Sequence, residues 1–239
     1  MDFSELQRLK EKFNAKKSAL GSAWDSFERS FDIEYAHNST AIEGNTLSLI
    51  ETKAVLEDNL SIGGKSLREI YEVVNHKKAF SYVKNCVLEK QPLSEKTVKD
   101  IHAFLMENIM TGGIYRNVAV RITGAKHKPP VPSEMYTAIK GFYDRLPFKT
   151  ELNSIELAAY THAEFVKIHP FEDGNGRTAR LIMNYQLLSD GFLPVSVAKE
   201  DRLPYFETLE EYAVNGNLSP FAELVANLEK ERLTDIIAE

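Results

Sequence analysis

The sequence predicts a mainly α-helical protein, a helical bundle that carries one short β-hairpin. Hydrophobic residues recur at helical spacing along most of the 239 residues, and Ser-x-x-Glu capping boxes mark helix starts at Ser48 and Ser66. The exception is the segment 111–132, where paired glycines, alternating valines and three prolines predict a hairpin that ends in a stiff loop. We therefore expect one compact unit of helices with a β-hairpin flap.

The helices are expected in order along the whole chain. A heptad-like helix opens the sequence, and the next helix carries Trp24, Phe27 and Phe31 at a spacing that directs them towards the core. Later helices are expected after Ser48, Ser66, Ser94, Ser133 and Ser154, then from Arg177 to Ser189, from Leu203 to Ala213, and from Pro220 onwards.

These elements fall into three stretches of one unit. Residues 1–60 supply N-terminal helices, residues 61–215 a core, and residues 216–239 a C-terminal helix. The core includes the flap at 112–132 and the catalytic loop at 169–180. Residues 1–22 and the C-terminal helix have no assigned role, and a homodimer contact is a candidate for them.

The composition argues against two classes of partner. A formal charge of −6 and a pI near 5.6 give no basic footprint for nucleic acid. No apolar run approaches the roughly 20 residues that a membrane span needs, and the charged start does not resemble a secretory signal, so we expect a cytoplasmic protein. The single cysteine, Cys86, lies in a helical pattern and is expected to be a small buried side chain.

The segment His169 to Arg180, HPFEDGNGRTAR, is the most informative part of the chain. Gly174, Asn175 and Gly176 allow a tight turn with exposed N–H groups, and the helix that follows presents its positive dipole end to the same space. This turn is suited to bind a phosphate.

The charged residues around the turn fit the same interpretation. Arg177 and Arg180 lie on one face of the helix start, where two guanidinium groups can grip a polyphosphate. Asp173 is a hard oxygen ligand suited to Mg²⁺, and His169 is the nearby side chain that titrates close to neutral pH and can act as a general base. A packed interhelical turn with solvated charges is the alternative, and the combination of residue types disfavours it.

This segment resembles the Fic family signature His-x-Phe-x-(Asp/Glu)-Gly-Asn-Gly-Arg-x-x-Arg at every specified position. The resemblance implies a Fic-type helical bundle with a β-hairpin flap, and a protein adenylyltransferase that moves AMP from Mg-ATP to a Ser, Thr or Tyr hydroxyl of a target protein or of itself. It implies these roles: His169 as general base, Asp173 for Mg²⁺, and Gly174, Asn175, Gly176, Arg177 and Arg180 for the phosphates of ATP.

Two further regions acquire roles through the resemblance. The flap, with Arg121, Ile122, Thr123 and Gly124, is similar to the edge on which Fic proteins dock an extended target segment by β-augmentation. Tyr205 resembles a residue that lines the adenine pocket, although an ordinary aromatic residue on an amphipathic helix explains it equally well.

An upstream segment resembles the inhibitory motif of the family, (Ser/Thr)-x-x-x-Glu-(Gly/Asn). Here it reads Ser39, Glu43 and Gly44, within a helix expected at about 28–45. The resemblance implies the class with an N-terminal inhibitory helix, in which Glu43 pairs with Arg180 and occupies the space that the γ-phosphate needs.

Two other functions remain open from the sequence. The same site can run in reverse as a phosphodiesterase that removes AMP from a modified protein. Alternatively, the chain is a non-catalytic, ATP-responsive binding module, against which the presence of His169 argues because binding alone requires no base.

Overall fold

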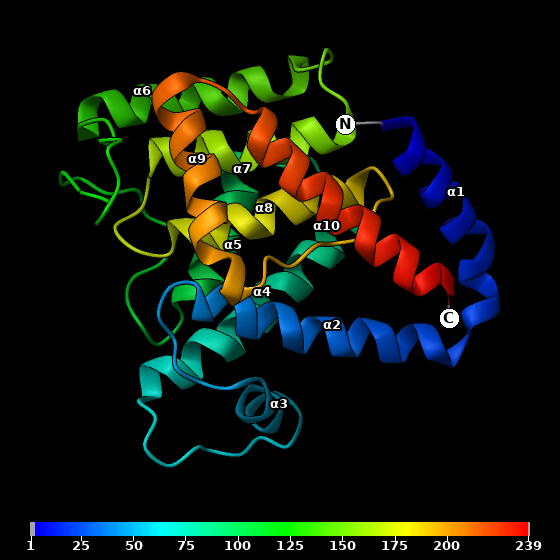
Figure 1. Cartoon of the computed structure of the whole chain (residues 1–239). Helices are drawn as coiled ribbons and strands as arrows, with labels where there is room; N and C mark the ends of the chain where they lie inside the picture. Colours follow the sequence, from blue (N-terminus) through cyan, green and yellow to red (C-terminus); the bar gives the residue numbers. More distant parts are fainter. Residues whose placement is uncertain (1–2, 239) are drawn as a thin grey trace.

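Helices α7 and α8 form the centre of the computed structural model, which describes residues 3–238 (Figure 1). Most side chains of both helices are buried, and helices α4, α5 and α10 pack around them. The α-helices are α1 (Phe3–Leu20), α2 (Ser22–Ala41), α3 (Leu49–Glu57), α4 (Leu67–Leu88), α5 (Glu95–Met106), α6 (Pro132–Arg145), α7 (Ser154–Ile168), α8 (Asn175–Ser189), α9 (Arg202–Asn215) and α10 (Ser219–Ala238). Short 3-10 helices span Leu146–Phe148 and Lys199–Asp201. The mainly α prediction is confirmed.

Local capping explains where several helices begin. Both predicted capping boxes are present, at Ser48 before α3 and at Ser66 before α4. In each, the Ser side chain accepts a bond from the N3 backbone N–H and the N3 glutamate binds back to the cap. A third box caps α7 through Asn153. Helix α6 begins instead at Pro132, a residue that suits the first helical turn because it lacks an N–H.

The predicted β-hairpin is not formed, since no strand occurs within residues 3–238. The segment between α5 and α6 is irregular, and the buried guanidinium of Arg116 joins its two arms by donating to the carbonyl oxygens of Val118 (2.8 Å) and Pro130 (2.6 Å). Prolines 129 and 130 provide no N–H for a ladder. A two-stranded hairpin is marginal without further strands, so these side-chain contacts determine the loop.

The first and last helices lie side by side, because α1 packs along α10 (Figure 1). Lys16 donates to the carbonyl of Ile237 at 2.8 Å. Of the aromatic residues predicted for the core, Phe31 is buried, whereas Trp24 and Phe27 are half-buried. Cys86 is a buried free thiol within the main core, as expected.

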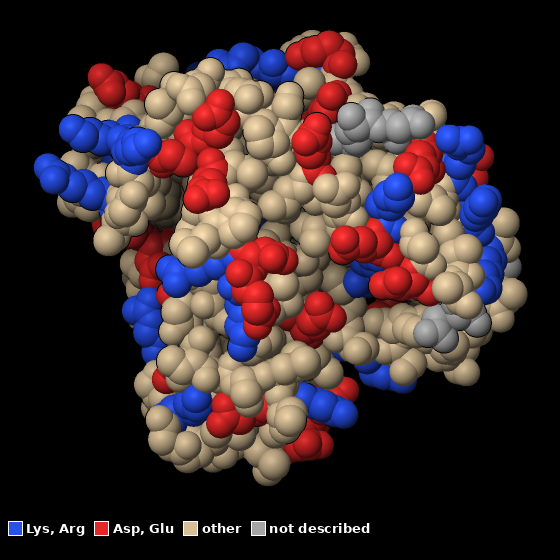
Figure 2. Space-filling view, in the orientation of Figure 1, with Lys and Arg blue, Asp and Glu red and all other residues tan. Residues whose placement is uncertain are grey.

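The charge distribution matches the composition. Figure 2 shows acidic and basic side chains interspersed over the face that it presents. Of the helices in the described part of the chain, none is both long enough and apolar enough to cross a membrane.

Candidate active site

The loop from α7 to α8 is bent by two residues with left-handed backbone. His169 ends α7 with φ 53° and ψ 60°, and Gly174 precedes α8 with φ 76°. The Asn175 side chain fixes the bend, because its Oδ1 accepts from the N–H of Phe171 (2.9 Å) and its Nδ2 donates to the Phe171 carbonyl (2.8 Å). Both polar atoms of that side chain are therefore used by the loop itself.

His169 is held as a neutral base. Its Nδ1 lies 3.3 Å from the Val166 carbonyl, to which an Nδ1–H donates, leaving Nε2 unprotonated and able to accept a proton. Burial lowers the pKa of His169 to about 4, and the positive charge of Arg116 acts in the same direction. Arg116 also holds the backbone here, donating from Nε to the His169 carbonyl at 2.7 Å and from its N–H to the Pro170 carbonyl at 2.9 Å.

The glycines of the turn are required by close approaches. A Cβ at Gly174 would collide with the Met106 methyl group, and a Cβ at Gly176 would collide with the Glu43 carboxylate. The carboxylate therefore sits directly over the Cα of Gly176, at the start of α8, where the helix dipole favours an anion.

Arg180 is completely enclosed by partners from other helices. Its Nε donates to Ser39 Oγ (2.9 Å), and its Nη2 donates to the Ser39 carbonyl (2.7 Å) and to Glu43 Oε1 (2.8 Å). The residue is 1% exposed, and although burial disfavours its charge, the oxygens of Tyr205 and Glu43 raise the pKa of Arg180 above its ordinary value. The structure thus brings together Ser39, Glu43 and Arg180, as expected from the sequence.

Glu43 lies in the turn directly after α2 and not within the helix. The backbone N–H groups of Glu43 and Gly44 bond back to the carbonyls of Thr40 and Ala41, each at 3.0 Å. Gly44 has φ 104°, which favours glycine and ends the helix. From this turn the Glu43 carboxylate reaches Gly176 in the first turn of α8.

Tyr205 contacts Arg180 from the side opposite Ser39. Its hydroxyl lies 3.2 Å from Arg180 Nη1 and 2.9 Å from His162 Nε2. The residue is 1% exposed, so its ring has no free face on which an adenine base can stack in this arrangement. In this arrangement Tyr205 helps to position Arg180 through that hydrogen bond.

Arg177 is buried like Arg180 but has two carboxylate neighbours. Its Nη2 lies 3.2 Å from Asp173 Oδ1, and its Nη1 lies 3.4 Å from Glu72 Oε1 on α4. Asp173 is further paired with Arg68 through Oδ2 and accepts the Gly174 N–H at 2.6 Å. Burial raises the pKa of Asp173, but the Arg177 and Arg68 charges outweigh it and lower the pKa overall.

Asp173 has the donor chemistry that Mg²⁺ prefers. No group of three or more His, Cys, Asp or Glu residues suitable for a metal occurs in residues 3–238. A single carboxylate is sufficient when phosphate oxygens and waters complete the octahedron, so the residues fit a metal that arrives with a nucleotide. Of the Asp173 oxygens, Oδ2 is paired with Arg68.

The proposed docking loop is exposed. Arg121, Thr123 and Gly124 face solvent, Ile122 is half-buried, and the N–H of Ala125 turns back to the Ile122 carbonyl at 3.2 Å. The following residues are anchored, since the N–H groups of residues 126 and 127 donate to Glu210 Oε1 on α9 at 2.7 and 3.1 Å. These four residues lie close in sequence to the anchor but form no strand.

Several residues of the site were not identified from the sequence, and three of them contact the loop 169–180 directly. Arg116 and Arg68 are described above. His102 on α5 stacks on Phe171, with 3.6 Å between ring centroids, and its Nε2 lies 3.0 Å from the Asp173 carbonyl. All three belong to segments far from the loop in sequence, and no local motif marks them.

Comparison with known proteins agrees with this geometry. The profile of the Fic/DOC family matches residues 92–187. Protein adenylyltransferase Fic of Nematostella vectensis is 35% identical over 210 residues, which are 86% of this chain and 48% of that protein. The chain therefore spans about half the length of the curated relatives that it matches.

Solved structures extend the match to nearly the whole chain. A Fic-domain-containing signalling protein from Bacteroides thetaiotaomicron superposes with a TM-score of 0.89 at 26% identity, covering 97% of this chain and 96% of that one. Fic-1 from C. elegans superposes with a TM-score of 0.85 at 31% identity, covering 98% of this chain and 70% of that one. Fold and site together define a helical domain with a glycine-containing loop between two central helices. The chain belongs to the Fic family.

Proposed function

We propose that this protein transfers AMP from Mg-ATP to a hydroxyl group of a protein, and that Glu43 inhibits the transfer. The observation that carries the proposal is a half-buried, neutral His169 at one end of a glycine turn whose other end presents the buried Arg180. Curated relatives that are 30% and 35% identical bear the name protein adenylyltransferase Fic. The hydroxyl comes from a Ser, Thr or Tyr side chain of a target or of this chain.

The reaction needs a base, a cradle for the phosphates and charge neutralisation. His169 Nε2 takes the proton of the attacking hydroxyl, whose oxygen forms a bond to the α-phosphorus while the bond from that phosphorus to the β-phosphate oxygen breaks. The N–H groups at Gly176 and neighbouring residues and the Arg180 guanidinium receive the departing pyrophosphate charge. Mg²⁺ bound through Asp173 would add positive charge on the same phosphates.

The inhibition follows from the place that Glu43 occupies. Its carboxylate lies over Gly176 and bonds Arg180 at 2.8 Å, so a phosphate cannot use the same guanidinium edge and the same helix start at once. A hundredfold suppression of turnover needs a bias of only about 2.7 kcal/mol, within reach of a charge-assisted bond supported by Ser39.

The test is intact mass after incubation with Mg-ATP. We compare wild type, Glu43→Gly, Glu43→Gln and Glu43→Gly with His169→Ala. We expect an added AMP on Glu43→Gly and less on wild type, with Glu43→Gln intermediate because it retains the shape and removes the charge. The double variant should show none. Equal modification of wild type and Glu43→Gly would exclude inhibition by Glu43.

Hydrolysis of AMP from a modified protein is a second candidate, and one observation favours it. Only Oε1 of Glu43 is hydrogen-bonded among the described residues, which leaves Oε2 able to orient a water. Release of AMP from a pre-modified protein without ATP, lost in Glu43→Gly, would identify this direction. ATP binding with neither reaction would indicate a binding module.

A further inference from the structure

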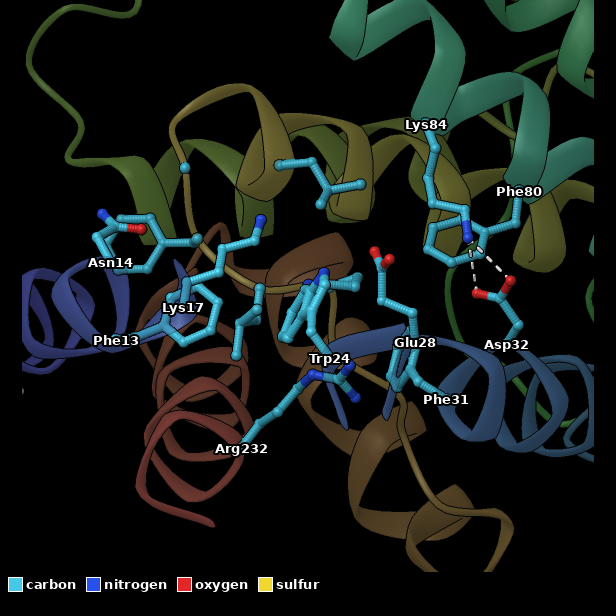
Figure 3. Close-up of a pocket in the computed structure, with 15 residues that line it drawn as sticks. Phe13, Asn14, Lys17, Trp24, Glu28, Phe31, Asp32, Phe80, Lys84 and Arg232 are labelled. Atoms are coloured by element: carbon cyan, nitrogen blue, oxygen red, sulfur yellow. Dashed lines mark hydrogen bonds and ion pairs between the residues drawn. The ribbon is translucent and has the colours of Figure 1, made fainter. Parts of the chain in front are cut away.

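A cavity of about 170 Å³ lies between α1, α2 and α10, and none of its lining residues belongs to the loop 169–180 (Figure 3). It has room for several waters at ~30 Å³ each, and so for a small organic molecule. Five of the residues that line it are aromatic: Phe13, Trp24, Phe31, Phe80 and Phe192.

The cavity also holds charged groups that the protein does not pair. Arg232 extends from α10 towards Trp24 and Phe31 (Figure 3), with its guanidinium 3.5 Å from the Phe31 ring centroid. Its Nε is buried and has no hydrogen-bond partner within residues 3–238. Lys17 lies over the Trp24 ring at 4.7 Å and forms no ion pair in the described part of the chain. A buried donor without an acceptor costs free energy that a ligand oxygen would recover.

The remaining charges of the lining decide the sign and size of the ligand. Lys84 and Asp32 neutralise each other at 2.8 Å, and Glu28 contributes one carboxylate. Lys17 and Arg232 therefore leave a net charge of one positive. Burial lowers the pKa of Arg232 to about 10, partly offset by nearby carboxylates, so its charge is retained at neutral pH. A ligand with several negative charges would be repelled by Glu28 and Asp32.

We propose that this cavity binds a small monocarboxylate with a flat apolar body, its carboxylate on Arg232 and its body between the aromatic walls. Apolar contact with the rings supplies most of the buried area, and the guanidinium group selects the carboxylate and its orientation.

The same helix connects this cavity to Arg180. Helix α2 contributes Trp24, Phe31 and Asp32 to the cavity wall and Ser39 to the Arg180 contact. Between them, Tyr35 stacks on Phe31 with 5.4 Å between centroids. If α2 shifts when Glu43 disengages, a ligand that fits the cavity as α2 lies here binds this arrangement more tightly and so stabilises the Glu43-engaged state. This second step rests on the proposed function; the binding itself does not.

Trp24 is the only tryptophan of the chain, so its fluorescence reports on the cavity directly. The 239-residue chain is titrated with phenylacetate, its neutral amide phenylacetamide and the cation phenethylamine, with calorimetry as a second readout. We expect saturable binding of phenylacetate at least tenfold tighter than of the amide. No saturable binding, equal binding of the amide, or tighter binding of phenethylamine would overturn the proposal.

Matched arginine variants locate the contact. Arg232→Met should weaken phenylacetate binding at least tenfold and leave amide binding unchanged. Arg202→Met is the control, because Arg202 also lies over a ring, that of Phe206 at 5.3 Å, but outside the cavity. If Arg232→Met fails to fold, Lys17→Met, an exposed position, should weaken phenylacetate about threefold relative to the amide. Unchanged phenylacetate binding in a folded Arg232→Met or Lys17→Met variant would contradict the proposed carboxylate contact in this cavity.

The coupling is tested separately. Phenylacetate should slow AMP transfer by wild type severalfold, whereas Glu43→Gly should show no slowing and should bind phenylacetate more weakly by a similar factor, because the two equilibria are linked. Binding without any AMP transfer in either protein would contradict the proposed function and leave the cavity assignment intact. Slowing of both proteins alike would exclude a route through Glu43.

Discussion

Arg177 and Arg180 stand three residues apart on α8, both buried, yet their surroundings differ. Arg180 has four hydrogen bonds, and its one carboxylate partner, Glu43, keeps 34% of its side-chain surface exposed. Arg177 lies between Glu72 and Asp173, and its Nε and Nη1 make no hydrogen bond within the described residues. One arginine is held by a single, partly exposed carboxylate, and the other lies between two carboxylates, of which Glu72 is largely buried.

The difference separates two tasks that the sequence assigned jointly to both residues. A carboxylate at the solvent-accessible edge can give way to a phosphate with little desolvation, and this suits Arg180 for the nucleotide. A cation between two carboxylates on packed elements positions them, and this suits Arg177 for holding Asp173. The following expectations test that division.

The largest effect should come from Arg180. In the Glu43→Gly background, Arg180→Gln should lower the rate of AMP transfer about 10²- to 10³-fold, because it removes a preorganised charged donor from the phosphates. Arg180→Lys keeps the charge, so its rate of AMP transfer should lie between the rates with arginine and with glutamine at this position. The rate is measured by mass spectrometry under single-turnover conditions, and a loss below about tenfold would remove Arg180 from the nucleotide site.

The next effect concerns stability. Glu72→Gln leaves the buried Arg177 with one carboxylate fewer and should lower the free energy of unfolding by about 3 kcal/mol. Glu43→Gln should cost less than about 1 kcal/mol, because Glu43 is partly exposed. Urea denaturation of the two variants makes the comparison. Equal losses of unfolding free energy in the two variants would mean that Glu72 and Glu43 stabilise their arginines to the same extent.

Ser39 should give a smaller effect. Ser39→Ala removes one hydrogen bond to Arg180 Nε, worth about 1 kcal/mol, and should raise the basal transfer rate about fivefold. Ser30→Ala, on an exposed face of the same helix, is the matched control. In the Glu43→Gly background Ser39→Ala should add nothing, and additive effects would argue that Ser39 acts independently of Glu43.

The pH dependence should show the smallest change. His169 must be neutral to accept a proton, and its pKa is lowered to about 4. The rate for Glu43→Gly should therefore stay constant as pH falls through 6.5, the ordinary value, and decline only as it approaches about 4. Log rate is measured against pH. A decline centred near pH 6.5 would show that His169 is more exposed during turnover than in this structure.

The sequence was sufficient for features encoded by neighbouring residues. The capping boxes at Ser48 and Ser66 and the glycine turn before α8 each depend on residues within a few positions, and all were found. The contact between Glu43 and Arg180 spans 137 positions and was predicted only through resemblance to a family.

Features that depend on tertiary contacts were missed or mistaken. The alternating valines of the flap predicted a hairpin, but Arg116 bridges the carbonyls of the segment and the prolines withhold donors. Arg68 lies 105 positions from Asp173, and no periodicity in the sequence indicates that the two side chains meet. Tyr205 was found as an aromatic residue of a helix, while its contact with Arg180 required the packing of α9.

The bare Cα of Gly176 has a consequence for how this protein can change over generations. A methyl group there would displace the Glu43 carboxylate, but it would also fill the space in which a phosphate would lie. A substitution at Gly176 should therefore abolish both the inhibition by Glu43 and the binding of the phosphate, whereas a substitution at Glu43 should abolish the inhibition alone. Uninhibited variants should therefore arise by substitution of Glu43, directly after α2. A lineage that loses Gly176 should lose the activity with it.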